Sequence, residues 1–221
     1  MVAPFRPEAA RRAPFRALVR VLAWALALAA LAGSAASARP ALVVLIRHGH
    51  KDRPAGQQSS NYNLSAIGQR QALQLGERLP ACLGLRPETL RLASFGFDLD
   101  TGKNARSYQT LVPLAVASAR NIRVLADAEQ ASETIGQRLL QDPAYAGTTL
   151  VIAWEHRHLP PLARGLGWPT MPAVDDGDFD SLWLLRYSTD DPRPVVRVDS
   201  QSRLLAACGS GAAPDRPDRR P

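Results

Sequence analysis

The chain has 221 residues, of which 46% are hydrophobic, and its formal net charge is +7. Five arginines and one glutamate lie in the first 38 residues, so the net charge from residue 39 onward falls to +3. An excess this small gives no reason to expect nucleic-acid binding, and the remaining length suits one domain with a sizeable core.

The first 38 residues have the layout of a secretory signal. Basic residues come first, an apolar run covers 21–32, and Ala36-Ser37-Ala38 fits the A-x-A pattern of a cleavage site. The rival interpretation is a transmembrane anchor, but this run is shorter than the ~20 residues that a span needs. We therefore predict a signal peptide over 1–38, a periplasmic or secreted protein, and no stable membrane anchor once the signal is removed.

From residue 39 on, predicted strands alternate with predicted helices. This alternation favours an α/β fold, a single domain over 39–208 with a mostly parallel central sheet and helices on both faces. The last two strands are expected to form an antiparallel edge. The tail 209–221 has no large apolar residue and is predicted to be disordered. Strands are predicted over 41–46, 89–94, 122–125, 148–154, 182–187 and 195–199, and helices over 64–79, 104–118, 133–141 and 160–166.

Local signals refine this outline. Ser65 and Asn104 are predicted N-caps of the first two helices, and Pro113 is expected to kink or interrupt the second. Cys82 and Cys208 are the only two cysteines. An exported protein can pair them, but spacing alone leaves a disulfide and two separate buried thiols equally open.

Unusual polar residues stand where the apolar runs end. Arg47 and His48 follow the first strand at once, Arg106 follows the second, and His156 follows the fourth. In open α/β sheets, ligands gather beyond the carboxyl ends of the strands. These four side chains are therefore predicted to share one site.

The four histidines fall into two H-x-H pairs, at 48 and 50 and at 156 and 158. Two such pairs could form a zinc site. However, Arg47 and Arg157 adjoin the pairs, and guanidinium groups repel a divalent cation but bind phosphoryl oxygens well. A neutral imidazole can also attack phosphorus. The residues favour a phosphate site, and zinc is the alternative.

The ordered set of motifs resembles the histidine phosphatase (phosphoglycerate-mutase-like) superfamily. Its R-H-G tripeptide is matched by 47–49, its L-[ST]-x-x-G-x-x-Q-A segment by 64–72, its R-x-x-Q-T element by 106–110, and its late histidine by His156. The resemblance covers about 42–168 and implies a phosphoglycerate-mutase-like fold.

The resemblance implies a metal-independent phosphomonoesterase that uses no cofactor and works through phosphohistidine. His48 would be the nucleophile, Arg47 and Arg106 would bind the phosphoryl oxygens, and His156 would stabilise the transition state. The expected partner is a small phosphomonoester or a phosphorylated macromolecule. A phosphatase is preferred to a mutase because the chain is short.

The general acid is less clearly marked. One branch of the family carries an Asp directly after the late histidine, but Arg157 stands there, so that branch is excluded. The other branch takes its acid from the loop after the third strand. The candidates there are Asp127, Glu129 and Glu133, of which Glu129 is preferred, and Glu155 is a further candidate.

Other polar residues have weaker assignments. Asn61 and Asn63 suit either a turn or substrate contact, and Asn63 is the one assigned to substrate. His50 and His158 are expected at the rim of the site, and Lys51 either extends this rim or is solvated. The acidic run 175–180 lacks EF-hand spacing and is predicted to be a solvated loop.

A module that binds a phosphorylated ligand without turnover is an alternative function for the whole protein.

Overall fold

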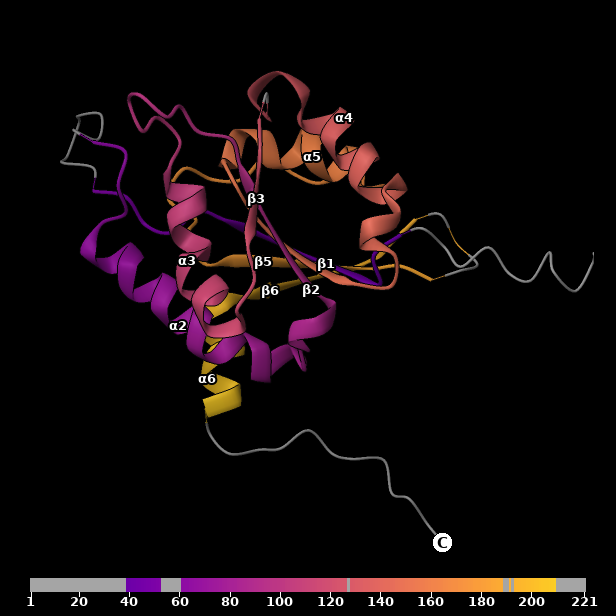
Figure 1. Ribbon diagram of the computed structural model, residues 1–221, viewed down its shortest axis with the longest axis horizontal. Helices are drawn as coiled ribbons and strands as arrows, with labels where there is room; N and C mark the ends of the chain where they lie inside the picture. Colours follow the sequence, from indigo (N-terminus) through magenta and orange to yellow (C-terminus); the bar gives the residue numbers. More distant parts are fainter. Residues whose placement is uncertain (1–38, 53–60, 127, 189–190, 192, 210–221) are drawn as a thin grey trace, which may run out of the picture. The chain divides into compact units, whose positions relative to one another are not determined.

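The structure is a computed structural model, and it describes residues 39–52, 61–126, 128–188, 191 and 193–209 (Figure 1). All of these residues belong to one compact unit. The predicted signal peptide over 1–38 and the predicted tail from 210 on lie outside them. Residue 209, which was assigned to the tail, is the last residue of a helix. No helix in the described part of the chain is long and apolar enough to cross a membrane.

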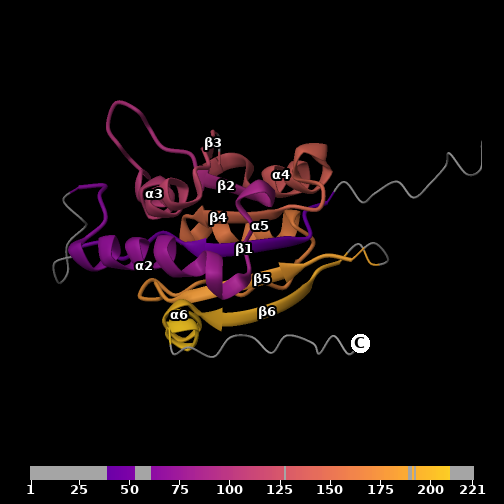
Figure 2. The same ribbon diagram turned by 60° about the horizontal axis from the view of Figure 1, so that its bottom comes forward.

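A six-stranded sheet forms the centre of the domain, in the order β3-β2-β4-β1-β5-β6 (Figure 2). The pairs β1–β4, β2–β4 and β2–β3 are parallel, whereas β5 pairs antiparallel with both β1 and β6. The predicted mostly parallel sheet with an antiparallel edge is thus confirmed. The strands are β1 (Leu42–Arg47), β2 (Leu90–Phe95), β3 (Ile122–Leu125), β4 (Thr149–Trp154), β5 (Ser181–Arg186) and β6 (Val195–Ser200).

Helices cover both faces of this sheet, as the sequence predicts. Alternate residues of β1 point to opposite faces. Val43 and Leu45 pack in the core under α4 and α5, while Val44 and Ile46 pack in the core under α2, α3 and α6 (Figure 2). The helices are α2 (Ala66–Leu83), α3 (Arg106–Ser118), α4 (Ala128–Gln141), α5 (Leu159–Gly165) and α6 (Gln201–Gly209), with 3₁₀ turns η1 (Pro87–Thr89), η2 (Pro143–Tyr145) and η3 (His156–His158).

Helix ends test the local predictions. Ser65 is the N-cap of α2 and accepts a hydrogen bond from the Gly68 N–H at 3.1 Å, as expected. The predicted cap at Asn104 is wrong: α3 begins at Arg106, and Asn104 has a left-handed backbone (φ 71°) before it. Such a conformation suits an asparagine in a turn.

Two further expectations about helices are corrected. Pro113 does not interrupt α3, which continues to Ser118. Close packing against α2 holds this region, since a Cβ at Gly76 would lie 2.7 Å from the Pro113 carbonyl carbon. Helix α4 begins at Ala128, five residues before the predicted start, and has a non-helical residue at Ala131. The predicted helix over 133–141 lies in the regular part of α4 that follows Ala131.

Cys82 and Cys208 form a disulfide, with their Cα atoms 5.4 Å apart. This decides between the two alternatives that the sequence leaves open. The bond joins α2 to α6 across 126 residues of sequence, so it closes a loop that contains most of the described domain.

We expect reduction of this disulfide to lower the free energy of unfolding. Closing a loop of this length restricts the unfolded chain by about 5 kcal/mol in the chain-entropy model, and measured values are commonly about 2–4 kcal/mol. Urea unfolding with and without reductant measures the difference. The Cys82→Ser/Cys208→Ser double variant should be insensitive to reductant, and two free thiols in the unreduced, denatured wild type would contradict the prediction.

Candidate active site

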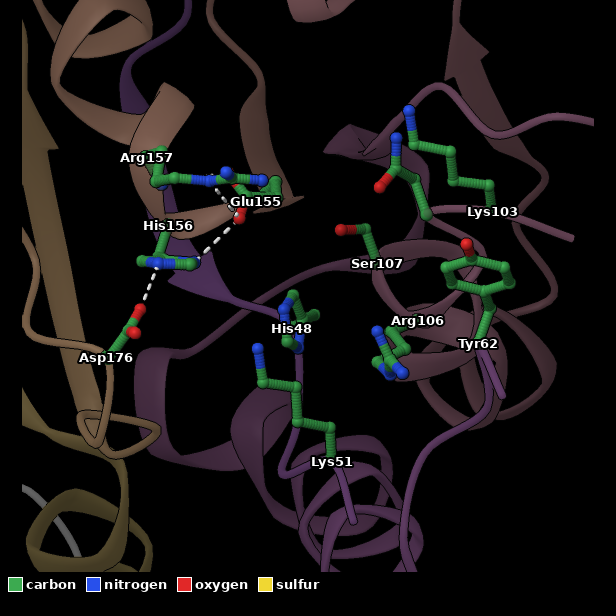
Figure 3. A pocket seen from close by; sticks show the side chains of 11 residues that line it. His48, Lys51, Tyr62, Lys103, Arg106, Ser107, Glu155, His156, Arg157 and Asp176 are labelled. Atoms are coloured by element: carbon green, nitrogen blue, oxygen red, sulfur yellow. Dashed lines mark hydrogen bonds and ion pairs between the residues drawn. The ribbon is translucent and has the colours of Figure 1, made fainter. Parts of the chain in front are cut away.

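A cavity of about 370 Å³ opens at the carboxyl ends of the parallel strands (Figure 3). The segments that follow β1, β2 and β4 form most of it, and the segment before β5 closes one side. It brings together His48, Arg106 and His156, three of the four residues that the sequence assigns to one site. The lining residues are His48, Lys51, Tyr62, Lys103, Asn104, Arg106, Ser107, Glu155, His156, Arg157 and Asp176.

The backbone of His48–His50 leaves the sheet here, and side chains from two helices bind it. A strand end exposes N–H and C=O groups that must find partners when they are buried. In this segment the three N–H groups and the His50 carbonyl have partners from elsewhere in the fold. The bonds run from His48 N to Trp154 O (3.1 Å), from Gly49 N to Thr110 Oγ1 (2.8 Å), from His50 N to Gln71 Oε1 (2.9 Å) and from Ser65 N to His50 O (2.9 Å).

The first turn of α2 packs tightly on this segment. A Cβ at Gly68 would lie only 2.2 Å from the His50 carbonyl oxygen, so only glycine fits there. The residues of the two helical motifs that resemble the superfamily pattern therefore have a common structural task, which is to fix the backbone on both sides of His48.

His48 is buried and has a defined tautomer. Its Nδ1 lies 2.8 Å from the Gly49 carbonyl oxygen, which can only accept, so Nδ1 carries the proton and Nε2 keeps a lone pair. Burial lowers the pKa of His48 to about 3, with further lowering by the charges of Arg47, Arg106 and Lys51. The ring is consequently neutral throughout the physiological pH range.

Basic side chains outnumber acidic ones around the cavity. Lys51, Lys103, Arg106 and Arg157 line it, against Glu155 and Asp176. The Arg106 Nε donates to the Asn63 carbonyl oxygen at 2.9 Å, and another of its nitrogens donates to the Asn61 carbonyl. Burial lowers the pKa of Arg106. The cavity therefore suits an anionic ligand.

Arg47 lies deeper than predicted and is not among the lining residues, being 1% exposed. Its Nη1 donates to the carbonyl oxygens of Asp175, Asp176 and Asp178 at 2.8–2.9 Å, and its guanidinium stacks on Phe179 at 3.9 Å. Burial lowers its pKa to about 10, against the raising effect of nearby carboxylates. Its Nε and Nη2 have no hydrogen-bond partner among the residues that the structure describes.

Both ring nitrogens of His156 face carboxylates (Figure 3). Nδ1 lies 2.7 Å from Glu155 Oε1, and Nε2 lies 2.5 Å from Asp176 Oδ1. The first contact lacks hydrogen-bond geometry, since Nδ1 has no aligned acceptor among the described residues. Burial raises the pKa of Glu155, but His156 and Arg157 outweigh it and lower the pKa to about 2. Glu155 is therefore ionised in the free protein.

Two of the three acids predicted after β3, Glu129 and Glu133, do not line the cavity. Glu129 lies 3.4 Å from the Lys103 Nζ, and Glu133 is paired with Arg164 at 2.8 Å. Asp127 lies outside the described residues. Of the four candidates from the sequence, only Glu155 lines the cavity in the described part of the chain.

Asn63 supports Arg106 and does not line this cavity. Its carbonyl accepts from Arg106, and its side-chain Oδ1 accepts from Gln109 Nε2 at 2.8 Å. Lys51 lines the cavity, which is one of the two alternatives that the sequence leaves open, but the sequence reasoning did not single out Tyr62, Lys103, Ser107 or Asp176. The closely spaced aspartates of 175–180 were the one available signal for Asp176.

The four histidines do not converge. His48 and His156 line the cavity, whereas His50 packs on Phe179 with ring centroids 5.0 Å apart. His158 packs on Phe95 in the same way, at 5.3 Å. Within the part of the chain that the structure describes, no three His, Cys, Asp or Glu side chains are grouped as metal ligands. The zinc alternative has no ligand set there.

Comparison with known proteins gives distant structural likenesses. No family model matches the sequence, and no curated protein matches it. Similar solved structures include mycobacterial glucosyl-3-phosphoglycerate phosphatase (17% identity, 72% of this chain and 97% of that chain, TM-score 0.47). Others are mycobacterial hydrolase 2 (16%, 77% and 97%, 0.46) and the protein histidine phosphatase SixA complexed with tungstate (13%, 74% and 99%, 0.47). At this distance the chemistry of the cavity has to follow from its own residues.

We expect Thr110→Val to weaken both the fold and the site. Valine keeps the shape but leaves the buried Gly49 N–H without an acceptor, which costs about 1–3 kcal/mol. Urea unfolding measures the effect on the fold, and the affinity for inorganic phosphate measures the effect on the site. Thr110→Ser keeps the hydroxyl and is the control. A Thr110→Val protein as stable as wild type would show that this hydrogen bond does not fix the segment.

We expect the His48 ring to stay neutral between pH 8 and pH 4, because its pKa is lowered to about 3. NMR titration of the ring resonances from pH 8 to 4 measures this, and His48→Asn assigns the signal. An unfolded chain binds a proton at His48 near the ordinary pKa of 6.5, whereas the folded protein does so only near 3. The contribution of His48 to the free energy of unfolding therefore falls as the pH drops through this window. A midpoint near 6.5 for the assigned signal would contradict the prediction.

Proposed function

We propose that this protein is a metal-independent phosphomonoesterase of the histidine phosphatase (phosphoglycerate-mutase-like) type, in which His48 carries the phosphoryl group. The observation that carries the proposal is a neutral, buried imidazole whose Nδ1 proton is held by a backbone carbonyl inside a cavity rich in basic side chains. Its Nε2 lone pair is thereby available as a nucleophile.

The reaction follows from this geometry in two steps. In the first, His48 Nε2 forms a bond to phosphorus while the P–O bond to the leaving group breaks, and the leaving oxygen takes up a proton. In the second, water attacks phosphorus, the P–N bond breaks, and phosphate and neutral His48 are formed. Arg106 and the Nε2–H of His156 would hold the phosphoryl oxygens as negative charge redistributes.

Arg47 supports the phosphoryl site in a different way. Its Nε and Nη2 groups are buried without a partner, and buried unpaired donors are costly. A phosphoryl oxygen is the acceptor that a guanidinium binds best. We infer that Nη1 holds the backbone of 175–178 beside the site, and that substrate would reach Nε and Nη2 only if the cavity wall over Arg47 moves.

The export of this protein is part of the proposal. The layout of 1–38 predicts a signal peptide, and the Cys82–Cys208 disulfide is of the kind that persists in oxidising compartments. We therefore propose a periplasmic or secreted enzyme that acts on an extracytoplasmic phosphomonoester.

One observation favours the second candidate, a module that binds phosphorylated ligands without turnover. Glu155 is ionised, and Glu129 does not line the cavity, so neither supplies a proton to a leaving group in this arrangement. Binding of phosphate or vanadate without hydrolysis of any of several monoesters would identify such a module.

We expect the purified protein to hydrolyse p-nitrophenyl phosphate at a rate that EDTA does not change. Replacing His48 by Asn should abolish turnover because it removes the nucleophile, while the amide retains a donor for the Gly49 carbonyl. Rapid acid-free quenching with ³²P-labelled substrate should trap phosphohistidine in wild type only. Activity that survives in His48→Asn would refute the assignment, and loss of activity in EDTA that zinc restores would favour the metal alternative.

A further inference from the structure

We propose that Asp176 is the proton donor to the leaving group, a catalytic residue that the sequence motifs do not indicate. This inference rests on the proposed phosphatase function and completes it. The starting point is the lining of the cavity. Among the described residues that line it, Glu155 and Asp176 are the only carboxylic acids.

Glu155 is poorly suited to give up a proton. It is buried, accepts hydrogen bonds from the Arg157 N–H and guanidinium, and contacts His156 Nδ1. These partners stabilise the carboxylate. Its role is to hold His156 and Arg157 at the cavity wall, so Asp176 remains as the acid that faces the ligand.

Asp176 lies where a leaving group can be protonated. Its Oδ1 is 2.5 Å from His156 Nε2, the donor that a phosphoryl oxygen would also take, and its side chain is 60% exposed (Figure 3). When a phosphoryl dianion enters, two anions meet at one N–H group. Such neighbours favour one shared proton, and the open side of Asp176 lets solvent supply it.

The segment that carries Asp176 is held in place by Arg47, the residue directly before His48. Arg47 Nη1 binds the carbonyl oxygens of Asp175, Asp176 and Asp178. The side chains of Asp175 and Asp178 accept backbone N–H groups within the same turn. Phe179 packs against Arg47 and His48, with its ring 5.9 Å from the His48 ring. A proton donor needs this fixed placement relative to the nucleophile.

The proton balance is simple. In the first step, Asp176 in its acid form gives its proton to the bridging ester oxygen as the P–O bond breaks and the P–N bond forms, leaving an alcohol and a carboxylate. In the second step, the Asp176 carboxylate takes a proton from the attacking water. The P–N bond then breaks, and the acid form is restored with the release of phosphate.

The test compares two leaving groups in matched variants. Asp176→Asn keeps an acceptor for His156 but has no proton to give. For an alkyl ester such as glycerol 2-phosphate, kcat/KM should fall by about 10²–10⁴-fold. For p-nitrophenyl phosphate, whose leaving group is a stable anion, the fall should stay below about tenfold. The control Asp175→Asn removes the same charge one residue away, keeps the acceptor for Gly177 N–H, and should change neither.

The other outcomes are decisive as well. An equal fall for both esters in Asp176→Asn would show a structural role, and a rise for both would show that Asp176 competes with substrate. An alkyl-specific loss in Glu129→Gln, absent from Asp176→Asn, would move the assignment to Glu129. Wild type that hydrolyses neither ester overturns the phosphatase proposal itself. Wild type that hydrolyses both, with Asp176→Asn unchanged on the alkyl ester, overturns only this inference.

Discussion

The site depends on how the chain satisfies its backbone polar groups where β1 ends. Three consecutive residues leave the sheet in a buried place, where unpaired N–H groups would be costly. Thr110 and Gln71 supply acceptors from two different helices, and Gly68 allows the closest of these helices to approach. The same bonds that satisfy the backbone aim the His48 ring. The position of His48 is thus a property of the packed core, not of a free loop.

Burial and charge act together on the groups in the cavity. Desolvation and neighbouring cations keep His48 neutral, which its proposed role as nucleophile requires. At Glu155 burial acts against the charged form, but His156 and Arg157 lie against the carboxylate and stabilise it. Two titratable groups a few residues from the same sheet edge are therefore driven to opposite forms, an uncharged base and a charged acid. This separation of roles is typical of sites where proton transfers must be directed.

Much of this arrangement could be predicted from sequence, and the failures have physical causes. Period and composition locate every strand to within one residue or so. The signal is clearest for β1 and β4, which are apolar and buried on both faces. His48, Arg106 and His156 were grouped because parallel strands end at one edge. Pro113 was misjudged because packing outweighs the propensity of one residue.

Asp176 was missed for a different reason. The segment 175–178 is placed by its backbone carbonyls, which accept hydrogen bonds from Arg47. Every residue has such a carbonyl, so the sequence cannot indicate which of them bind Arg47. Arg47 itself was recognised as unusual, but the sequence could not show that one of its nitrogens serves the fold while two others have no partner. Sequence reasoning finds side chains that need an unusual environment more readily than the segments that provide it.

The reversed direction of β5 has a consequence for the site as a whole. Leu182, near the start of β5, pairs with Ile46, near the end of β1. The chain that enters β5 must therefore cross the edge of the sheet where the parallel strands end, immediately beside His48. A parallel strand in that position would begin at the opposite rim and leave this flank open to water. The antiparallel direction of β5 thus gives the cavity a fourth side. It also brings the acidic side chain of Asp176 to an edge that is otherwise formed by the segments after the parallel strands.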